Sequence, residues 1–256
     1  MAYDGTDFSG WAVQPNRRTV CGIIEEFLFQ ILRRRVRLTV AGRTDAGVHA
    51  TGQVAHMDIP PSVDLNTLLH RLSRALPADV RVTALTEASP DFDARFTALR
   101  RHYAYRVCDT QWRANPLNRG HVVTWPRPLD VPSLNAASEL LLGEHDFVAF
   151  CKRREGATTI RELQQLAWTR EGDILTARVA ADAFCHSMVR SLVGALLAVG
   201  EGRKPVTWPS SMLSAAERPS AITVAPAHGL TLTQVDYPAT ADLAARATQT
   251  RRIRTR

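Results

Sequence analysis

The sequence predicts an α+β fold with a mixed or antiparallel sheet, and three observations support this. Several segments carry apolar residues with the helical period of about 3.6 residues, which is typical of amphipathic helices. Other segments alternate apolar and polar residues, as half-buried strands do. The strands come in runs and do not alternate strictly with helices, which argues against a doubly wound parallel sheet.

Helical periodicity is clearest over residues 20–32, where Thr19 is suited to be the N-cap. A second helix is expected over 65–76, because its leucines recur at helical spacing and Pro77 follows. Two further helices are expected over 134–142, which stops at Gly143, and over 186–199.

Strands are expected wherever alternation is bounded by turn residues. Residues 170–173 between two such runs predict a hairpin. The expected strands are 36–40, 53–59, 80–87, 101–108, 163–168, 174–181 and 230–235.

These elements form two similar sets around a proline-rich segment. The predicted organisation is an N-terminal half over 1–108, a crossover over 109–132, a C-terminal half over 133–238 and a basic tail over 239–256. The tail is rich in alanine and arginine, and we expect it to be mobile.

The composition favours a polyanionic partner such as nucleic acid or a membrane surface. The 256 residues carry a formal net charge of +7, and 45% of them are hydrophobic, which is enough for a substantial core. No apolar stretch is long enough to cross a membrane, and the N-terminal residues do not resemble a signal peptide.

Cysteine usage predicts a reduced, cytoplasmic protein. Cys21, Cys108, Cys151 and Cys185 lie far apart and form no CxxC pair, which argues against a structural zinc site or a disulfide framework.

The segment 41–49 combines a carboxylate, a guanidinium and two glycines just after a predicted strand. Asp45 and Arg43 are two residues apart, so we expect an ion pair that favours the ionised carboxylate. Such a carboxylate can act as a nucleophile or a base. The alternative is an Asx-type turn with a surface ion pair, and this segment alone favours that alternative.

Several segments taken together, in order and over nearly the whole chain, resemble the tRNA pseudouridine synthase A family. The loop around Asp45 is the most specific of them. The matching segments are 3–11, 18–20, 41–50, 92–96, 101–105, 143–147, 184–194 and 225–230.

This resemblance implies an enzyme that isomerises uridine to pseudouridine at positions 38 to 40 of the tRNA anticodon arm. It implies a homodimer without cofactor or metal, with two α/β halves that share a mainly antiparallel central sheet with helices on one face, the pseudouridine synthase fold. Asp45 would be the catalytic aspartate, Arg43 its ion-pair partner, and Tyr103 the residue that stacks on the target base. Arg190 would line the same cleft.

The residue types agree with this chemistry. A base inside a stacked arm must be flipped out before it can react. Tyr103 offers a stacking face and a hydroxyl that can assist loss of the C5 proton, and Arg190 can pair with Asp45 or with a phosphate. Further RNA contacts are expected from Thr44, His49, Arg95 and Arg101.

Each of these side chains also has a structural alternative. Tyr103 on an alternating strand is, taken alone, more often core or sheet surface than a stacking platform. Arg190 can extend from an apolar helix to water, and His49 can cap the loop as well as contact RNA.

The sequence departs from the family pattern in three places, one of which is residues 99–101 together with the tail, where no family pattern applies. A strand usually precedes the segment that begins at Tyr3, whereas only Met1 and Ala2 do so here. Either the recorded start lies too far downstream, or that strand is missing and an edge is left unpaired. Ala12 and Val13 also replace a Gln-Arg pair, so we expect one fewer interaction with RNA there.

The rival hypothesis is a noncatalytic RNA-binding protein or tRNA chaperone that uses the same basic surface and aromatic residue. Asp45 discriminates between the two, because a binder gains little from an anion that faces phosphates. A metal-dependent hydrolase fits worst, since no HxxE, HxH or clustered carboxylates provide metal ligands.

Overall fold

The computed structural model describes residues 1–152, 158–215 and 217–251. The described chain divides into two compact units: unit 1 contains residues 1–99 and 232–251, and unit 2 contains residues 100–231. The chain therefore passes into unit 2 at residue 100, before the boundary at 108 that the sequence suggested, and its last segment returns to unit 1.

Unit 1 contains a small antiparallel sheet built from short strands. The strand order is β5–β1–β3–β11, from Val80–Arg81, Ala2–Tyr3, His49–Ala50 and Leu230–Asp236. β1 pairs antiparallel with β3 on one side and with β5 on the other. The strand at Ala2–Tyr3 is thus an inner strand and not an unpaired edge.

Three of the predicted strands of unit 1 are shorter than their alternation suggested. β2 (Thr39–Val40) and β4 (Ala55–His56) pair only with each other, in a separate two-stranded sheet. β5 covers only the first two residues of the predicted 80–87 strand. The alternation of apolar and polar residues indicates which side chains are buried. A strand also needs a neighbouring strand whose backbone it can pair with.

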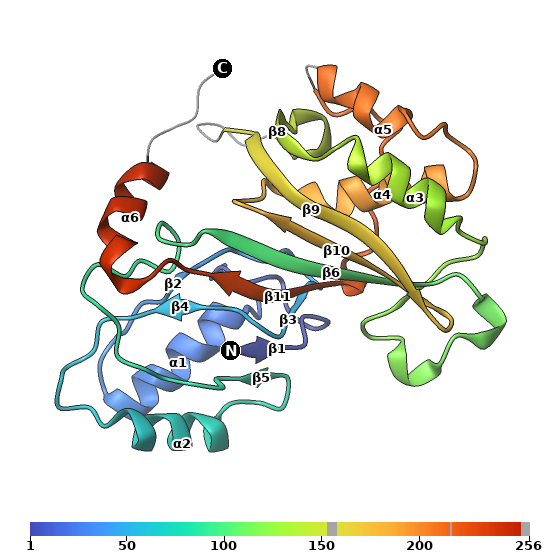
Figure 1. Ribbon diagram of the computed structural model, residues 1–256. Coiled ribbons are helices and arrows are strands. Elements are labelled where there is room, and N and C mark those ends of the chain that lie inside the picture. Colours follow the sequence, from blue (N-terminus) through green and yellow to red (C-terminus); the bar gives the residue numbers. More distant parts are fainter. Residues whose placement is uncertain (153–157, 216, 252–256) are drawn as a thin grey trace. The chain divides into compact units, whose positions relative to one another are not determined.

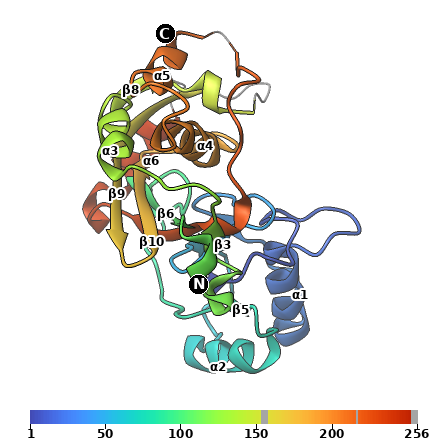
Figure 2. The same cartoon turned by 90° about the vertical axis from the view of Figure 1, so that its right-hand side faces the viewer.

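Two helices of unit 1 form where the sequence predicted them. α1 spans Val20–Leu32, and the Thr19 side chain accepts a hydrogen bond from the Gly22 backbone. α2 spans Leu65–Ala75, and the Asp64 carboxylate caps it in the same way. The two helices pack against each other (Figure 2), and their buried faces complete the core of this unit.

The described part of the predicted tail, residues 239–256, forms helical turns, and its mobility stays a prediction. Helix α6 spans Leu243–Arg251, with Leu243 and Ala247 buried. The Arg246 guanidinium donates a hydrogen bond of 3.2 Å to the carbonyl of Ala98. Small alanines favour a helix and let it pack closely. Residues 252–256 of the predicted tail lie outside the described part of the chain.

Unit 2 is built on long antiparallel strands (Figure 1). The strand order is β6–β10–β9–β8, from Arg100–Cys108, Ile174–Ala181, Ile160–Glu171 and Gly143–Asp146. A short strand, β7 (Val123–Thr124), pairs parallel with β6. The predicted hairpin is confirmed: β9 and β10 pair at Glu171 and Ile174, and Gly172 supplies a positive φ of 59° at the turn.

Helices α3 (Val131–Glu139) and α4 (Met188–Gly200) pack together in unit 2, and α3 also packs on β9. The Asn135 side chain of α3 bonds to both the N–H and the C=O of Trp168 on β9, which fixes the helix to the strand. A short helix, α5, spans Trp208–Ser211. Single turns of 3₁₀ helix lie at Gln111–Arg113, Pro116–Asn118, Val148–Phe150, Met212–Ser214, Ala227–Gly229 and Thr240–Asp242.

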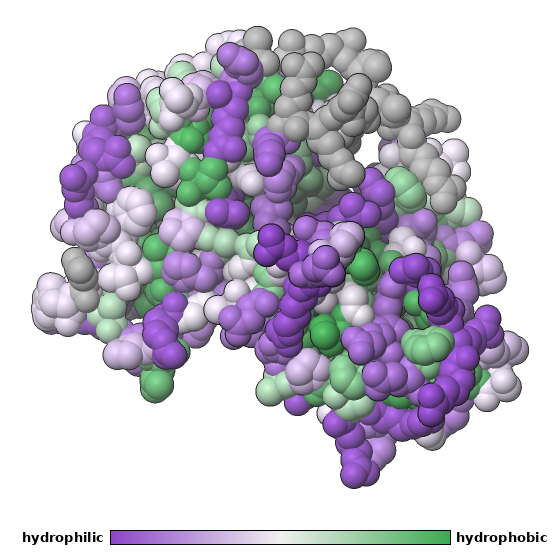
Figure 3. All heavy atoms as spheres, turned by 180° about the vertical axis from the view of Figure 1, so that it is seen from behind, coloured by the Kyte–Doolittle hydropathy of each residue, from purple (hydrophilic) through white to green (hydrophobic). Residues whose placement is uncertain are grey.

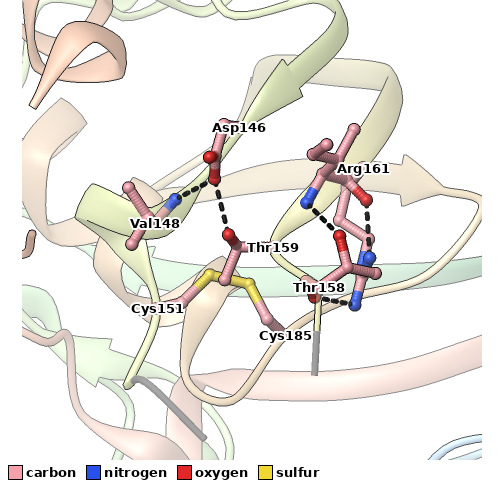
Figure 4. Close-up of a disulfide and its surroundings, with 8 residues drawn as sticks. Asp146, Val148, Cys151, Thr158, Thr159, Arg161 and Cys185 are labelled. Carbon is pink, nitrogen blue, oxygen red and sulfur yellow. Dashed lines mark hydrogen bonds between the residues drawn. A yellow bond between two sulfur atoms is a disulfide. The ribbon is translucent and has the colours of Figure 1, made fainter. Parts of the chain in front are cut away.

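The expectation that the chain contains no disulfide is wrong for one pair of cysteines. Cys151 and Cys185 form a disulfide, with Cα atoms 5.7 Å apart (Figure 4). They are 34 residues apart in sequence, and the intervening β9–β10 hairpin brings them together. Cys21 and Cys108 are free and buried. The spacing of the cysteines in the sequence did not reveal this disulfide, because the two residues approach each other only when β9 and β10 pair.

Within the described residues, no helix is both long enough and apolar enough to cross a membrane.

Candidate active site

The loop that carries Asp45 connects β2 to β3 and is held through its backbone. The Thr44 carbonyl accepts a hydrogen bond of 3.1 Å from the N–H of Trp11, and the N–H of Gly47 donates to the Phe8 carbonyl. Within the loop, the N–H of Val48 donates to the Asp45 carbonyl at 3.2 Å and closes a turn. The segment around Phe8 and Trp11 therefore fixes the position of the Asp45 backbone.

Two glycines of the N-terminal segment allow this close approach. A Cβ on Gly10 would lie 2.9 Å from the Thr44 carbonyl oxygen, and the φ of Gly10 is +92°. A Cβ on Gly5 would lie 2.1 Å from the Val48 carbonyl oxygen. Both contacts involve backbone atoms, so only glycine fits without displacing the loop.

A buried hydrogen-bond chain ties the loop to the sheet. The Tyr3 hydroxyl lies 2.8 Å from the Thr44 hydroxyl and accepts a hydrogen bond of 3.1 Å from the Gln53 side-chain amide. The same amide donates to the Gly42 carbonyl at 2.9 Å. Burial raises the pKa of Tyr3 to about 12, so its hydroxyl stays protonated and available for this chain.

Thr44 is therefore a structural residue of the loop. The sequence placed it among the RNA-binding residues, but its side chain is buried and bonded inside unit 1. The sequence did not reveal Tyr3 as the partner of Thr44, because the two residues come from separate segments that meet only in the folded chain.

Asp45 is partly exposed and Arg43 is exposed. The ion pair expected between their side chains stays a prediction.

His49 follows the loop on β3 and is buried. Its Nδ1 atom accepts a hydrogen bond of 3.0 Å from the Gly5 backbone N–H, and it also lies 3.0 Å from an Asp4 carboxylate oxygen. Of the two roles considered from the sequence, these contacts favour the one within the protein.

Arg95 is the remaining expected site residue of unit 1, and its side chain is exposed. Its guanidinium lies 5.0 Å from the centre of the Phe96 ring, within the range of a cation–π contact.

Tyr103 and Arg101 are on β6 in unit 2 and are two residues apart, so they project to the same side of the strand. Both are mostly buried. Each meets the connection between β10 and α4: Arg101 donates a hydrogen bond to the Asp182 carbonyl, and the rings of Tyr103 and Phe184 pack edge to face at 5.2 Å. This connection therefore sets the surroundings of Tyr103.

Arg190 lies in the first turn of α4. Its Nε donates a hydrogen bond of 2.7 Å to the Ala225 carbonyl, and its own carbonyl accepts one from the Ala225 N–H. Partial burial and the nearby charge of Arg190 lower the pKa of Arg218. Two neighbouring guanidinium groups are suited to bind an anion, and the sequence did not single out Arg218.

The surface offers many charged side chains for a polyanion. Figure 3 shows hydrophilic side chains over much of one face, with smaller hydrophobic areas between them. No group of three or more histidine, cysteine, aspartate or glutamate side chains that could hold a metal ion occurs in the described part of the chain.

The structure places the expected site residues in two sets. Arg43, Thr44, Asp45, His49 and Arg95 belong to unit 1, and Tyr103, Arg101 and Arg190 belong to unit 2. The first set provides a carboxylate on a rigid loop, and the second an aromatic ring and guanidinium groups. Together these groups can supply a nucleophile or base, a stacking surface and phosphate ligands.

Comparison with known proteins gives a consistent result. Residues 1–97 and 137–238 match a family model described as tRNA pseudouridine synthase. The chain is 57% identical to the tRNA pseudouridine synthase A of Frankia casuarinae, over 99% of this chain and 93% of that protein. It is 54% identical to the protein of the same name from Mycobacterium leprae, over 99% of this chain and 93% of that protein. It is 55% identical to the tRNA pseudouridine synthase A of Streptomyces griseus, over 100% of this chain and 92% of that protein.

Proposed function

The chain belongs to the tRNA pseudouridine synthase family, and from this premise we propose that it isomerises uridine to pseudouridine in tRNA, at positions 38 to 40 of the anticodon arm. The observation that carries the proposal most directly is the loop of Asp45. It offers one partly exposed carboxylate on a backbone that the N-terminal segment holds at several points.

The reaction breaks the bond between N1 of the uracil and C1′ of the ribose, turns the base, and joins C5 to C1′. The proton on C5 is then lost. Asp45 begins this sequence either by attacking the sugar or by removing a proton from it, and both routes require the carboxylate form. A fixed loop holds the carboxylate in one position, which reduces the entropic cost of reaching the reacting geometry.

The target base must leave the stacked arm before it can react. Tyr103 is the proposed stacking residue, and such stacking contributes about 1–3 kcal/mol per base. Arg190 and Arg43 are proposed to bind phosphates of the tRNA, and Arg95 is proposed as a further phosphate contact. Arg101 acts through the connection that it holds beside Tyr103.

The remaining properties that we propose come from the family resemblance. The protein acts as a homodimer in the cytoplasm, binds tRNA, and needs no cofactor or metal. The net charge of +7 supports a nucleic-acid partner, because each phosphate contact releases counterions.

Release of tritium from unmodified tRNA that carries 5-³H-uridine tests the proposal. The C5 proton leaves only when C5 becomes bonded to carbon, so we expect release by the wild type. Asp45→Asn should release none yet bind tRNA as well or better, because it removes an anion that repels phosphates. Asp91→Asn changes an exposed carboxylate of the same unit and serves as the matched control, with wild-type activity expected.

Two results would contradict the proposal. Wild-type protein that is folded and bound to tRNA but releases no tritium would favour the noncatalytic RNA-binding protein. Full activity of Asp45→Asn would remove the carboxylate from the chemistry.

A further inference from the structure

The disulfide between Cys151 and Cys185 has no role in the proposed reaction, but it lies next to the segment that contacts Tyr103, the proposed stacking residue. Cys185 directly follows Phe184, whose ring packs against Tyr103. The Cys185 carbonyl accepts a hydrogen bond of 3.0 Å from the Met188 N–H at the start of α4, the helix that carries Arg190. The disulfide is therefore attached to the connection that borders Tyr103 and Arg190.

The other end of the disulfide is anchored firmly. Cys151 is buried and directly follows the single 3₁₀ turn Val148–Phe150, and both Phe150 and the preceding Phe147 are fully buried. In Figure 4 the Asp146 carboxylate bonds to the Val148 N–H and to the Thr159 hydroxyl, which ties this turn to the start of β9. The disulfide to Cys151 thus fixes the connection between β10 and α4, which contains Cys185, to the core of unit 2.

Without the disulfide, the two segments share a weaker link. The Lys152 N–H donates a hydrogen bond of 2.9 Å to the His186 carbonyl. The connection after β10 is otherwise irregular: pairing with β9 shifts register between Ala180 and Ala181, and Ser187 has a positive φ of 64°. An irregular segment changes position more readily than a paired strand or a helix.

From these contacts we propose that Cys151 and Cys185 are a reversible redox site, and that the disulfide slows the enzyme by holding Phe184 against Tyr103. Tyr103 is only 8% exposed while Phe184 packs on it, so a flipped base needs this contact to adjust before it can stack. The disulfide opposes that adjustment and two free thiols permit it. The effect on rate rests on the proposed function, whereas formation of the disulfide does not.

The exchange reaction needs only a small-molecule disulfide as oxidant. Cys185 is partly exposed and reacts first: its thiolate attacks the small disulfide, forms a mixed disulfide and releases one small thiol. The Cys151 thiolate then attacks the Cys185 sulfur and displaces the second small thiol. Two cysteines are oxidised, one small disulfide is reduced to two thiols, and the two protein protons pass to those thiols.

The first test is chemical and requires no activity. Wild-type protein is equilibrated with oxidised or with reduced glutathione, its free thiols are alkylated, and its peptides are mapped by mass spectrometry. We expect four alkylated cysteines after reduction, and after oxidation a linked peptide pair that contains Cys151 and Cys185. Absence of that linked pair under oxidation would overturn the proposal, whether or not the protein is an isomerase.

The second test measures tritium release by the two forms of the wild type. We expect kcat of the oxidised form to be about 2- to 12-fold lower, the factor that one aromatic contact is worth, with tRNA affinity unchanged. Cys151→Ser and Cys185→Ser should each keep the rate of the reduced form under both conditions, while Cys21→Ser should still respond to oxidation. Equal rates of the oxidised and reduced wild type, or a faster oxidised form, would overturn the proposal.

Discussion

The position of Asp45 depends on residues that hold the backbone of its loop. Gly10, Trp11 and Phe8 hold the backbone of its loop, and the Tyr3 hydroxyl holds the neighbouring Thr44 side chain. A reacting group that is misplaced by about 1 Å can lose on the order of 10²-fold in rate. Changes in this supporting segment should therefore affect activity as well as stability.

Replacing Gly10 by alanine tests this support. The new Cβ would lie 2.9 Å from the Thr44 carbonyl oxygen at a φ of +92°, so either the loop or the segment must shift. We expect a loss of about 1–3 kcal/mol in the free energy of unfolding, measured in urea, and a lower kcat for tritium release.

Gly42→Ala is the matched control for Gly10→Ala. Gly42 lies in the loop of Asp45 itself, yet a Cβ there would meet no atom within 4 Å. Its stability and kcat should stay close to those of the wild type. Equal effects of the two alanines would show that the close approach at Gly10 does not position the loop.

At this scale the sequence predicted that Asp45 lies in a loop after a strand, because it stands between two glycines. It did not predict the surroundings of Asp45. The neighbouring Thr44 hydroxyl lies 2.8 Å from the Tyr3 hydroxyl, 41 residues earlier in the sequence, and Tyr3 in turn accepts a hydrogen bond from Gln53. Short spacing indicates which residues share a loop, but side-chain partners depend on contacts between distant segments.

At the scale of elements, the sequence predicted the long amphipathic helices and the long hairpin, but it did not predict the bounds of the short strands. The first two helices and the β9–β10 hairpin form where periodicity and turn residues placed them. The strand predicted over 53–59 is reduced to Ala55–His56. Helix α6 was missed because its stabilising contacts, such as that of Arg246 with Ala98, come from the other end of unit 1.

One ion pair ties together three elements of unit 2 and gives a pH-dependent prediction. Asp109, after β6, accepts two hydrogen bonds from the Arg170 guanidinium on β9 and one from the Leu129 N–H. The hydrogen bonds from Arg170 hold the pKa of the Asp109 carboxyl below its ordinary value of 3.8. The stabilisation is complete above that ordinary value and is lost as pH falls through the lowered one.

Asp109→Asn should therefore reduce the free energy of unfolding by about 1–3 kcal/mol near pH 7. The difference from the wild type should shrink as the pH falls below about 4, as followed by urea unfolding over a pH series. Asp173→Asn is the matched control, because its 3.7 Å pair with Arg113 is exposed and contributes little. A difference that is constant with pH would show that the ionised form of Asp109 does not stabilise the fold.

At the scale of the whole molecule, charge determines how the protein meets its substrate. Lysine and arginine number 32 against 25 aspartates and glutamates, and the sequence pI is about 9.8. The residues assigned to the reaction belong to two units, so we expect both units to contribute to tRNA binding. The sequence alone indicated this polyanionic partner, since net charge does not depend on fold.

Affinity for tRNA should fall steeply with salt concentration, because bound phosphates release counterions. We expect a linear plot of log K against log salt, measured by filter binding. Its slope should become shallower in Arg43→Ala and Arg190→Ala, by about 0.7–0.9 for each phosphate that the variant no longer binds. Asp91→Asn should leave the slope unchanged. A slope near zero for the wild type would exclude the proposed electrostatic binding.

The most direct measurement of the central claim is to map the product. Unmodified tRNA with uridines at positions 38 to 40 and elsewhere is incubated with the protein, digested with nuclease, and its fragments are analysed for pseudouridine. The account predicts pseudouridine in the anticodon-arm fragment with wild-type protein and none with Asp45→Asn. Pseudouridine only in other fragments would contradict the proposed target site. Its absence from every fragment, with tRNA bound, would contradict the isomerase itself.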